Sequence, residues 1–216
     1  MDQVKDPSPP ITKPKQLLVE GRTPYLFFEV LTAHLGIQEV ELHDFGSIAQ
    51  LGPFLRAFCA RPEFKEQVQS LAIIRDAEFA HETATQPRMA ERAFASVRSH
   101  LANAGQPTPN VSGAFSTTIP KTGVFILPNC RDSGMLETLC LDSVLTPRTS
   151  KCLEQYFKCM ESEGHPPPRN MTKASTFAFL AAKDVPDPLV GRAAQKGIWP
   201  WDSPAFQPLR DFLLAL

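Results

Sequence analysis

Apolar residues along the first 130 positions fall into two alternating patterns. Four short runs, continuously apolar or alternating with polar residues, are predicted to be strands: Gln16–Val19, Val40–Phe45, Val68–Ile74 and Val124–Leu127. Three stretches between them repeat apolar residues every three or four positions and are predicted to be helices: 23–35, Ile48–Ala60 and Pro87–Ala104. This alternation predicts an α/β fold, a mostly parallel four-stranded sheet with helices on both faces.

Prolines and glycines set the expected limits of these elements. Thr23 and Pro24 are typical of a helix start, and Gly36 of a helix end. Pro62 is expected to end the second helix, and Gly105 the third. Residues 105–122 are rich in Pro, Ser, Thr and Gly, which predicts a long loop or an irregular hairpin.

From Gly134 onward the pattern is helical. Helices are expected over Met135–Val144, Cys152–Met160 and Thr172–Lys183, with a last one after Ser203. The chain thus divides into three expected parts. These are a proline-containing disordered tail over 1–14, an α/β core over 15–130, and a helical C-terminal part over 131–216 that packs on the core.

Composition narrows the class of protein. With 43% hydrophobic and 21% charged among 216 residues, the chain can bury a sizeable core, which excludes wholesale disorder. The formal net charge of −1 removes the simplest case for nucleic-acid binding through bulk positive charge. A phosphate-bearing partner would need to be held locally, for instance through a metal ion.

Cysteine use and hydropathy give an expected location. The five cysteines include no C-x-x-C pair, so we expect reduced thiols, with Cys152 and Cys159 buried. No signal peptide and no apolar run of about 18 residues is visible, so we expect a cytoplasmic protein without a membrane partner.

Carboxylates follow three of the four predicted strands. Glu20 comes after the first, Asp44 after the second, and Asp76 and Glu78 after the third. Ligands of open parallel sheets bind at the carboxyl ends of the strands. If the first and third strands are neighbours, Glu20, Asp76 and Glu78 lie together, and such a cluster of oxygen ligands suits Mg²⁺ or Mn²⁺.

Each acid also has a structural explanation. An acid after a strand commonly caps a helix or faces solvent, and for Asp44 capping is the preferred interpretation. Other catalytic patterns are missing, because the chain has no glycine-rich phosphate loop and no G-x-S-x-G elbow. The aromatic pair Trp199 and Trp201 is expected to pack against the last helix rather than stack on bases.

The order of the elements resembles the TOPRIM fold of topoisomerases, primases and OLD-type nucleases, in which a glutamate after the first strand and an Asp-x-Asp after the third hold Mg²⁺. More specifically, the chain resembles a small uncharacterised prokaryotic family of TOPRIM-like proteins, a domain-of-unknown-function family, over about residues 15–215. The resemblance rests on these motifs: Val19-Glu20-Gly21, Arg75-Asp76, Phe125-Ile126-Leu127-Pro128, Gly134-Met135-Leu136-Glu137 and Gln195-Lys196-Gly197.

The resemblance implies roles for particular residues. Glu20 carries over as the general acid/base or metal-linked glutamate and Asp76 as a metal ligand, while Glu78 stands where the pattern has aspartate. Glu137 is either a further metal-binding carboxylate or a solvent-facing helix residue. Lys196 is more simply a solvated lysine than a phosphate ligand.

Two functions are therefore expected from the sequence. The first is a Mg²⁺-dependent nuclease or phosphoryl-transfer enzyme with Glu20, Asp76 and Glu78 at its centre. The alternative is a non-catalytic TOPRIM-like module that binds a nucleotide, nucleic acid or partner protein. The helical C-terminal part is compatible with a dimerisation element in either case, although the sequence does not specify one.

Overall fold

The structure, a computed structural model, describes residues 10–78 and 89–216. Its four strands form one parallel sheet in the order β2-β1-β3-β4. The strands are β1 (Lys15–Val19), β2 (Val40–Asp44), β3 (Ser70–Asp76) and β4 (Lys121–Leu127). The predicted α/β class with its parallel four-stranded sheet is confirmed, and β1 and β3 are neighbours.

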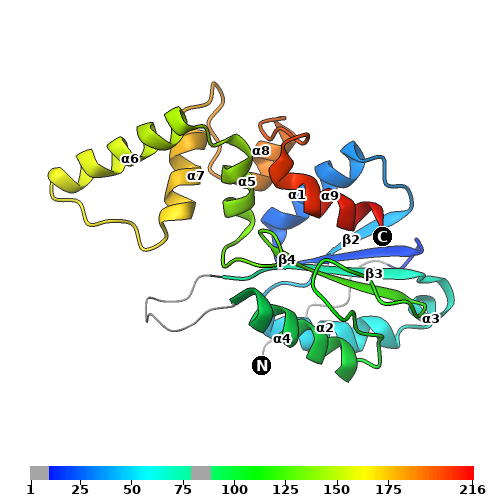
Figure 1. Ribbon diagram of the computed structural model, residues 1–216. Helices are drawn as coiled ribbons and strands as arrows, with labels where there is room; N and C mark the ends of the chain where they lie inside the picture. Colours follow the sequence, from blue (N-terminus) through cyan, green and yellow to red (C-terminus); the bar gives the residue numbers. More distant parts are fainter. Residues whose placement is uncertain (1–9, 79–88) are drawn as a thin grey trace.

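Helices cover both faces of the sheet (Figure 1). On one face lie α2 (Ile48–Ala60) and α4 (Met89–Asn103), with the short α3 (Pro62–Gln67) beside them. The opposite face carries α1 (Arg22–His34) and much of the C-terminal part. The remaining helices are α5 (Leu136–Val144), α6 (Pro147–Ser162), α7 (Met171–Ala181), α8 (Val190–Gln195), the 3₁₀ turn η1 (Pro204–Phe206) and α9 (Gln207–Leu214).

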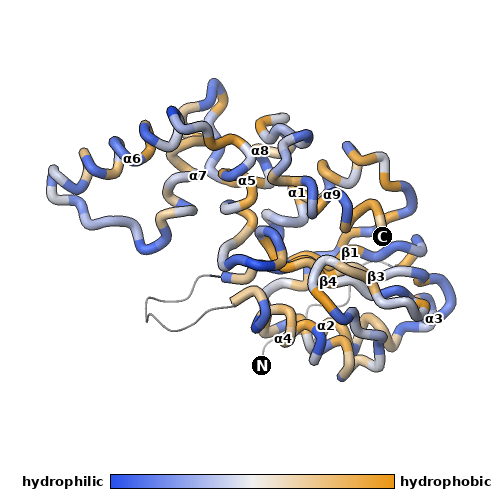
Figure 2. The backbone as a smooth tube through the Cα atoms, in the orientation of Figure 1, coloured by the Kyte–Doolittle hydropathy of each residue, from blue (hydrophilic) through white to orange (hydrophobic). Residues whose placement is uncertain are grey.

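Strand geometry explains why helices are needed on both sides. Successive side chains of a strand point to opposite faces, so Leu17 and Val19 enter one hydrophobic cluster and Leu18 enters the other. The cluster around Leu17 includes Trp199 and Phe212 from the C-terminal part. Figure 2 shows apolar stretches both in the strands and along the helices that pack on them. The C-terminal helices thus complete a core that the sheet begins.

Some element boundaries differ from expectation. β3 continues to Asp76, so Arg75 and Asp76 belong to the strand, and β4 already begins at Lys121, inside the expected loop. The second helix ends at Ala60, just before Pro62, as expected, but Pro62 also begins the unexpected short helix α3, where its missing N–H costs nothing. The short α8 was not expected, because six residues with a glycine give no clear periodicity.

Two expectations about exposure are corrected. Residues 1–9 of the expected tail lie outside the described residues, but Ile11 is buried in the core and Thr12 donates its N–H to the Glu41 carboxylate at 3.0 Å. The tail expectation is therefore wrong from residue 10 onward, because one apolar side chain finds a place in the core. Cys152 and Cys159 are exposed rather than buried, since no residue of α6 is fully buried.

The two tryptophans pack inside the protein, as expected. Trp201 contacts Phe27 and Phe206 with ring centroids 5.2 and 5.4 Å apart, and Trp199 donates its ring N–H to the Val190 carbonyl at 2.9 Å.

None of the helices within the described residues combines the length and apolarity needed to cross a bilayer.

Candidate functional site

Four carboxylates gather at the carboxyl edge of the sheet. Glu20 follows β1 directly, Asp76 ends β3, Glu78 lies two residues beyond, and Glu137 lies in the first turn of α5. Because β1 pairs with β3, with Val19 opposite Ile74, the ends of the two strands emerge side by side. The Glu137 side chain is only 14% exposed and its charge acts on Asp76, so it lies beside the other acids rather than in open solvent.

Asp76 is the most perturbed acid of this cluster. Its Oδ1 accepts the N–H of Leu136 at 2.9 Å, which ties the end of β3 to the start of α5. Burial raises the pKa of Asp76 to about 8, and the charges of Glu137, Glu78 and Glu20 push in the same direction while the Leu136 N–H opposes them. Near neutral pH this carboxyl therefore holds its proton unless a positive charge approaches.

Glu20 has one satisfied and one unsatisfied oxygen. Its Oε1 accepts the N–H of Ile48 at 3.1 Å, whereas Oε2 is buried without a hydrogen-bond partner. Burial raises the pKa of Glu20, Arg75 opposes that rise, Glu78 adds to it and the Ile48 N–H opposes it. A buried carboxylate oxygen without a donor is costly, so this atom is suited to receive a cation or a proton donor.

Arg75 lies beside Glu20 and Asp76, a role in the site that the sequence pattern did not predict. Its Nε donates to the Asp76 carbonyl at 3.1 Å and lies 3.9 Å from Glu20 Oε2. Only 8% of Arg75 is exposed, and its burial lowers the pKa of the guanidinium while the surrounding carboxylates oppose that shift. The sequence feature that could have revealed Arg75 is its place at the end of an otherwise apolar buried strand, since a buried charge needs a partner.

The backbones of Glu78 and Gly134 connect the loop after β3 to the loop after β4. Each donates its N–H to the carbonyl of the other, at 2.9 and 3.1 Å. Glu78 adopts a left-handed φ of 68°, which is unfavourable for glutamate and is sustained by this pairing. The exposed Glu78 side chain is thus carried by a backbone that two hydrogen bonds hold in place.

Other predicted residues have structural roles. Asp44 Oδ1 accepts the N–H groups of Gly21 and Gly46, both at 2.8 Å. It therefore connects the loops after β1 and β2 and is not the N-cap residue of a helix. Lys196 is exposed to solvent, as expected, and its Nζ lies 3.2 Å from Asp187 Oδ2. Lys173 lies 3.8 Å from Glu137 Oε1 and brings a second positive charge to the cluster.

The carboxylates at this edge suit a metal ion that binds one or two protein ligands better than a metal ion enclosed entirely by protein ligands. Within residues 10–78 and 89–216, no three histidine, cysteine, aspartate or glutamate side chains form a group that could hold a metal ion together. Magnesium usually keeps several waters and binds through one or two carboxylates plus a substrate phosphate. The half-buried Asp76 and the unsatisfied oxygen of Glu20 meet that smaller requirement in chemical type.

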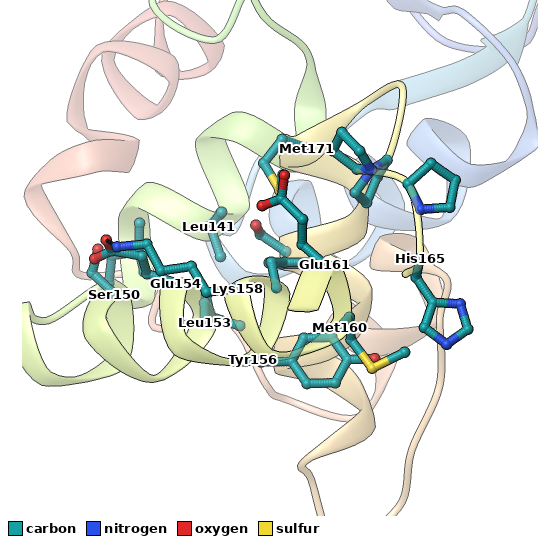
Figure 3. Close-up of a pocket in the computed structure, with 16 residues that line it drawn as sticks. Leu141, Ser150, Leu153, Glu154, Tyr156, Lys158, Met160, Glu161, His165 and Met171 are labelled. Carbon is teal, nitrogen blue, oxygen red and sulfur yellow. Dashed lines mark hydrogen bonds and ion pairs between the residues drawn. The ribbon is translucent and has the colours of Figure 1, made fainter. Parts of the chain in front are cut away.

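A cavity of about 530 Å³ lies elsewhere, among residues of α5, α6, α7 and the segment that connects α6 to α7 (Figure 3). None of the four carboxylates lines it. This cavity and the clustered charges therefore occupy different parts of the described chain, and the acidic edge is the candidate site for chemistry.

Comparisons with known proteins place the chain in a family. A family model described as "Protein of unknown function (DUF3226)" matches residues 14–216. Neither the comparison with curated proteins nor that with solved structures gives a significant match. Because the matched region spans the whole sheet and all C-terminal helices, the chain belongs to the DUF3226 family of proteins of unknown function.

Proposed function

We propose that this protein is a divalent-metal-dependent phosphoryl-transfer enzyme, in the first instance a nuclease, with Mg²⁺ or Mn²⁺ at the carboxyl edge of β1 and β3. The observation that carries the proposal is the gathering of Glu20, Asp76, Glu78 and Glu137 at this edge, where burial and the other three carboxylates raise the pKa of the half-buried Asp76 to about 8. A divalent cation among these groups would relieve their repulsion and restore the ionised form.

The residues divide into holding and supporting roles. Asp76 would hold the ion directly, with Glu78 or Glu137 as a second carboxylate and Glu20 reaching it directly or through water. The bound ion would neutralise charge on a phosphodiester and lower the pKa of an attacking water. Arg75 supports the site by lying beside Glu20 Oε2 and by donating to the Asp76 carbonyl.

A thermal-shift titration with MgCl₂ and MnCl₂ tests the metal site. We expect the wild type to gain several degrees in melting temperature, because an ion that binds only the folded state stabilises it. Asp76→Asn and Glu20→Gln should lose that gain, whereas Glu66→Gln, an exposed acid of α3, should keep it. A wild type that shows no shift with either ion would overturn the metal site.

Activity is tested with single-stranded and double-stranded DNA and RNA in the presence of Mn²⁺ and of EDTA. We expect cleavage that depends on the ion and is lost in Asp76→Asn, whose amide still accepts the Leu136 N–H. Cleavage unchanged in Asp76→Asn would place the chemistry elsewhere.

A second candidate is a non-catalytic module that binds a nucleotide, nucleic acid or partner protein. It is favoured by Arg75, whose guanidinium stands beside Glu20, and by Glu78, which departs from the aspartate of the TOPRIM pattern. This candidate predicts binding without turnover. A metal-induced thermal shift with no cleavage of any of the nucleic acids would support it.

A further inference from the structure

Helix α7 is anchored to the start of α5, the helix that carries Glu137 into the acidic edge (Figure 1). Asn170, the N-cap residue of α7, donates its side-chain N–H to Met135 Sδ at 3.8 Å. Further along α7, the buried Thr176 donates its hydroxyl to the Glu137 carbonyl at 3.3 Å. These contacts fix the first turns of α7 relative to Glu137.

Lys173 lies on α7 between these two anchor points. Its backbone N–H is accepted by Asn170 Oδ1 at 2.9 Å, so the base of the side chain has a defined place. Its Nζ lies 3.8 Å from Glu137 Oε1. The Lys173 side chain is 48% exposed, against 14% for Glu137, so the lysine is the member of the pair that a ligand from solution reaches first.

The contact with Glu137 leaves the Lys173 ammonium group able to take another partner. At 3.8 Å, the nitrogen and the carboxylate oxygen are farther apart than the limit of about 3.2 Å for an N–H···O hydrogen bond. Ion pairs with so exposed a member also contribute little to stability, because water screens them and ordering the side chains opposes them. Stabilisation of the fold is therefore a poor explanation for a lysine at this position.

The charges at the edge indicate what the partner would be. The four carboxylates carry up to four negative charges, of which one divalent ion offsets two. Arg75 offsets a third, but it is only 8% exposed and lies beside Glu20, so it is poorly placed to contact a substrate. An anionic substrate still needs a positive charge that it can touch, and Lys173 supplies one beside the same acids.

We propose that Lys173 binds a phosphate group of the substrate by moving its ammonium group from Glu137 to a phosphate oxygen. This inference rests on the proposed phosphoryl-transfer function and gives the C-terminal helices a part in substrate binding. Lysine suits this role, because it presents a compact positive charge on a flexible stem and makes charge-assisted hydrogen bonds to phosphate. Lys173 binds the substrate and takes no part in holding the metal ion.

The test measures binding of a fluorescein-labelled single-stranded DNA by fluorescence anisotropy, in CaCl₂ and over a series of NaCl concentrations. We expect Lys173→Ala to bind about tenfold more weakly than the wild type, because one charged contact to phosphate is lost. The slope of log K against log salt concentration should become shallower by about 0.7, the value for one phosphate contact of a single strand. Lys173→Arg should keep most of the affinity, because it keeps the charge.

Lys65→Ala is the matched control. It removes the same charge from an exposed position of α3, which precedes β3 and therefore lies toward the opposite edge of the sheet. This variant should bind the DNA as the wild type does. A wild type that does not bind the strand, an unchanged affinity and slope in Lys173→Ala, or an equal loss in Lys65→Ala or Lys173→Arg would overturn the role of Lys173.

The thermal shift with MnCl₂ separates this inference from the proposed function. Lys173→Ala should keep the gain in melting temperature of the wild type, and loss of that gain would show that Lys173 acts through the metal site instead. A wild type without the gain would overturn the metal site, whereas the comparison of DNA binding would still decide whether Lys173 contacts phosphate.

Discussion

At the scale of single residues, the acidic edge shows how burial changes chemistry. Asp76 and Glu20 are ordinary carboxylates in sequence, but burial raises both pKa values. Arg75 and the backbone N–H groups of Ile48 and Leu136 offset part of that cost. The raised pKa of Asp76 is expected to produce a measurable pH dependence of the free energy of unfolding.

We predict that Asp76→Asn flattens the pH dependence of the free energy of unfolding. The folded state holds the Asp76 proton more tightly than the unfolded state, so this contribution is present in full below the ordinary pKa of 3.8. It is lost as the pH rises toward about 8, by at most about 1.4 kcal/mol per pH unit. Urea unfolding at several pH values in EDTA measures the difference between wild type and variant, and parallel profiles would contradict the prediction.

At the scale of elements, close packing of α1 against α8 depends on a glycine. A Cβ built at Gly191 would lie 2.3 Å from the Thr23 carbonyl oxygen and 2.9 Å from the Leu26 Cβ. The first of these atoms belongs to the backbone of α1, which cannot move without moving the helix. Gly191 therefore sets how near α8 approaches α1, although sequence periodicity did not predict α8 at all.

We predict that Gly191→Ala destabilises the protein by about 1–3 kcal/mol, because the added methyl group forces the two helices apart. Gly36→Ala provides the matched comparison. Its site has open space but a φ of 64°, so only the left-handed backbone is penalised, at about 1–2 kcal/mol. Thermal unfolding of both variants measures the losses, and only Gly191→Ala should alter the environment of Trp199 and Trp201 in near-UV circular dichroism. An unchanged stability in Gly191→Ala would show that α8 can shift freely.

At the scale of the whole molecule, the C-terminal helices belong to the core of the sheet. Phe212 of α9 packs on Phe125 of β4 and Phe115 of the preceding loop, with ring centroids 5.3 and 4.8 Å apart. Trp201 reaches Phe27 of α1 in the same cluster. The sheet therefore depends on residues up to the last helix for the cover of one face.

We predict that Phe212→Ala lowers the free energy of unfolding by about 3–5 kcal/mol, the usual cost of removing a large aromatic side chain from a core. Leu214→Ala on the same helix is the control, because Leu214 is 60% exposed and should change stability little. Chemical denaturation followed by tryptophan fluorescence measures both. Equal losses in the two variants would contradict the inclusion of α9 in the core.

The sequence by itself determined the class of fold, because buried parallel strands and amphipathic helices differ in the spacing of their apolar residues. It also located Glu20, Asp76 and Glu78 at strand ends. Only the tertiary structure decided that Arg75 stands beside Glu20, that Glu137 joins the acids from α5, and that α6 has no fully buried residue. These features depend on which distant segments meet, and local spacing carries no information about that.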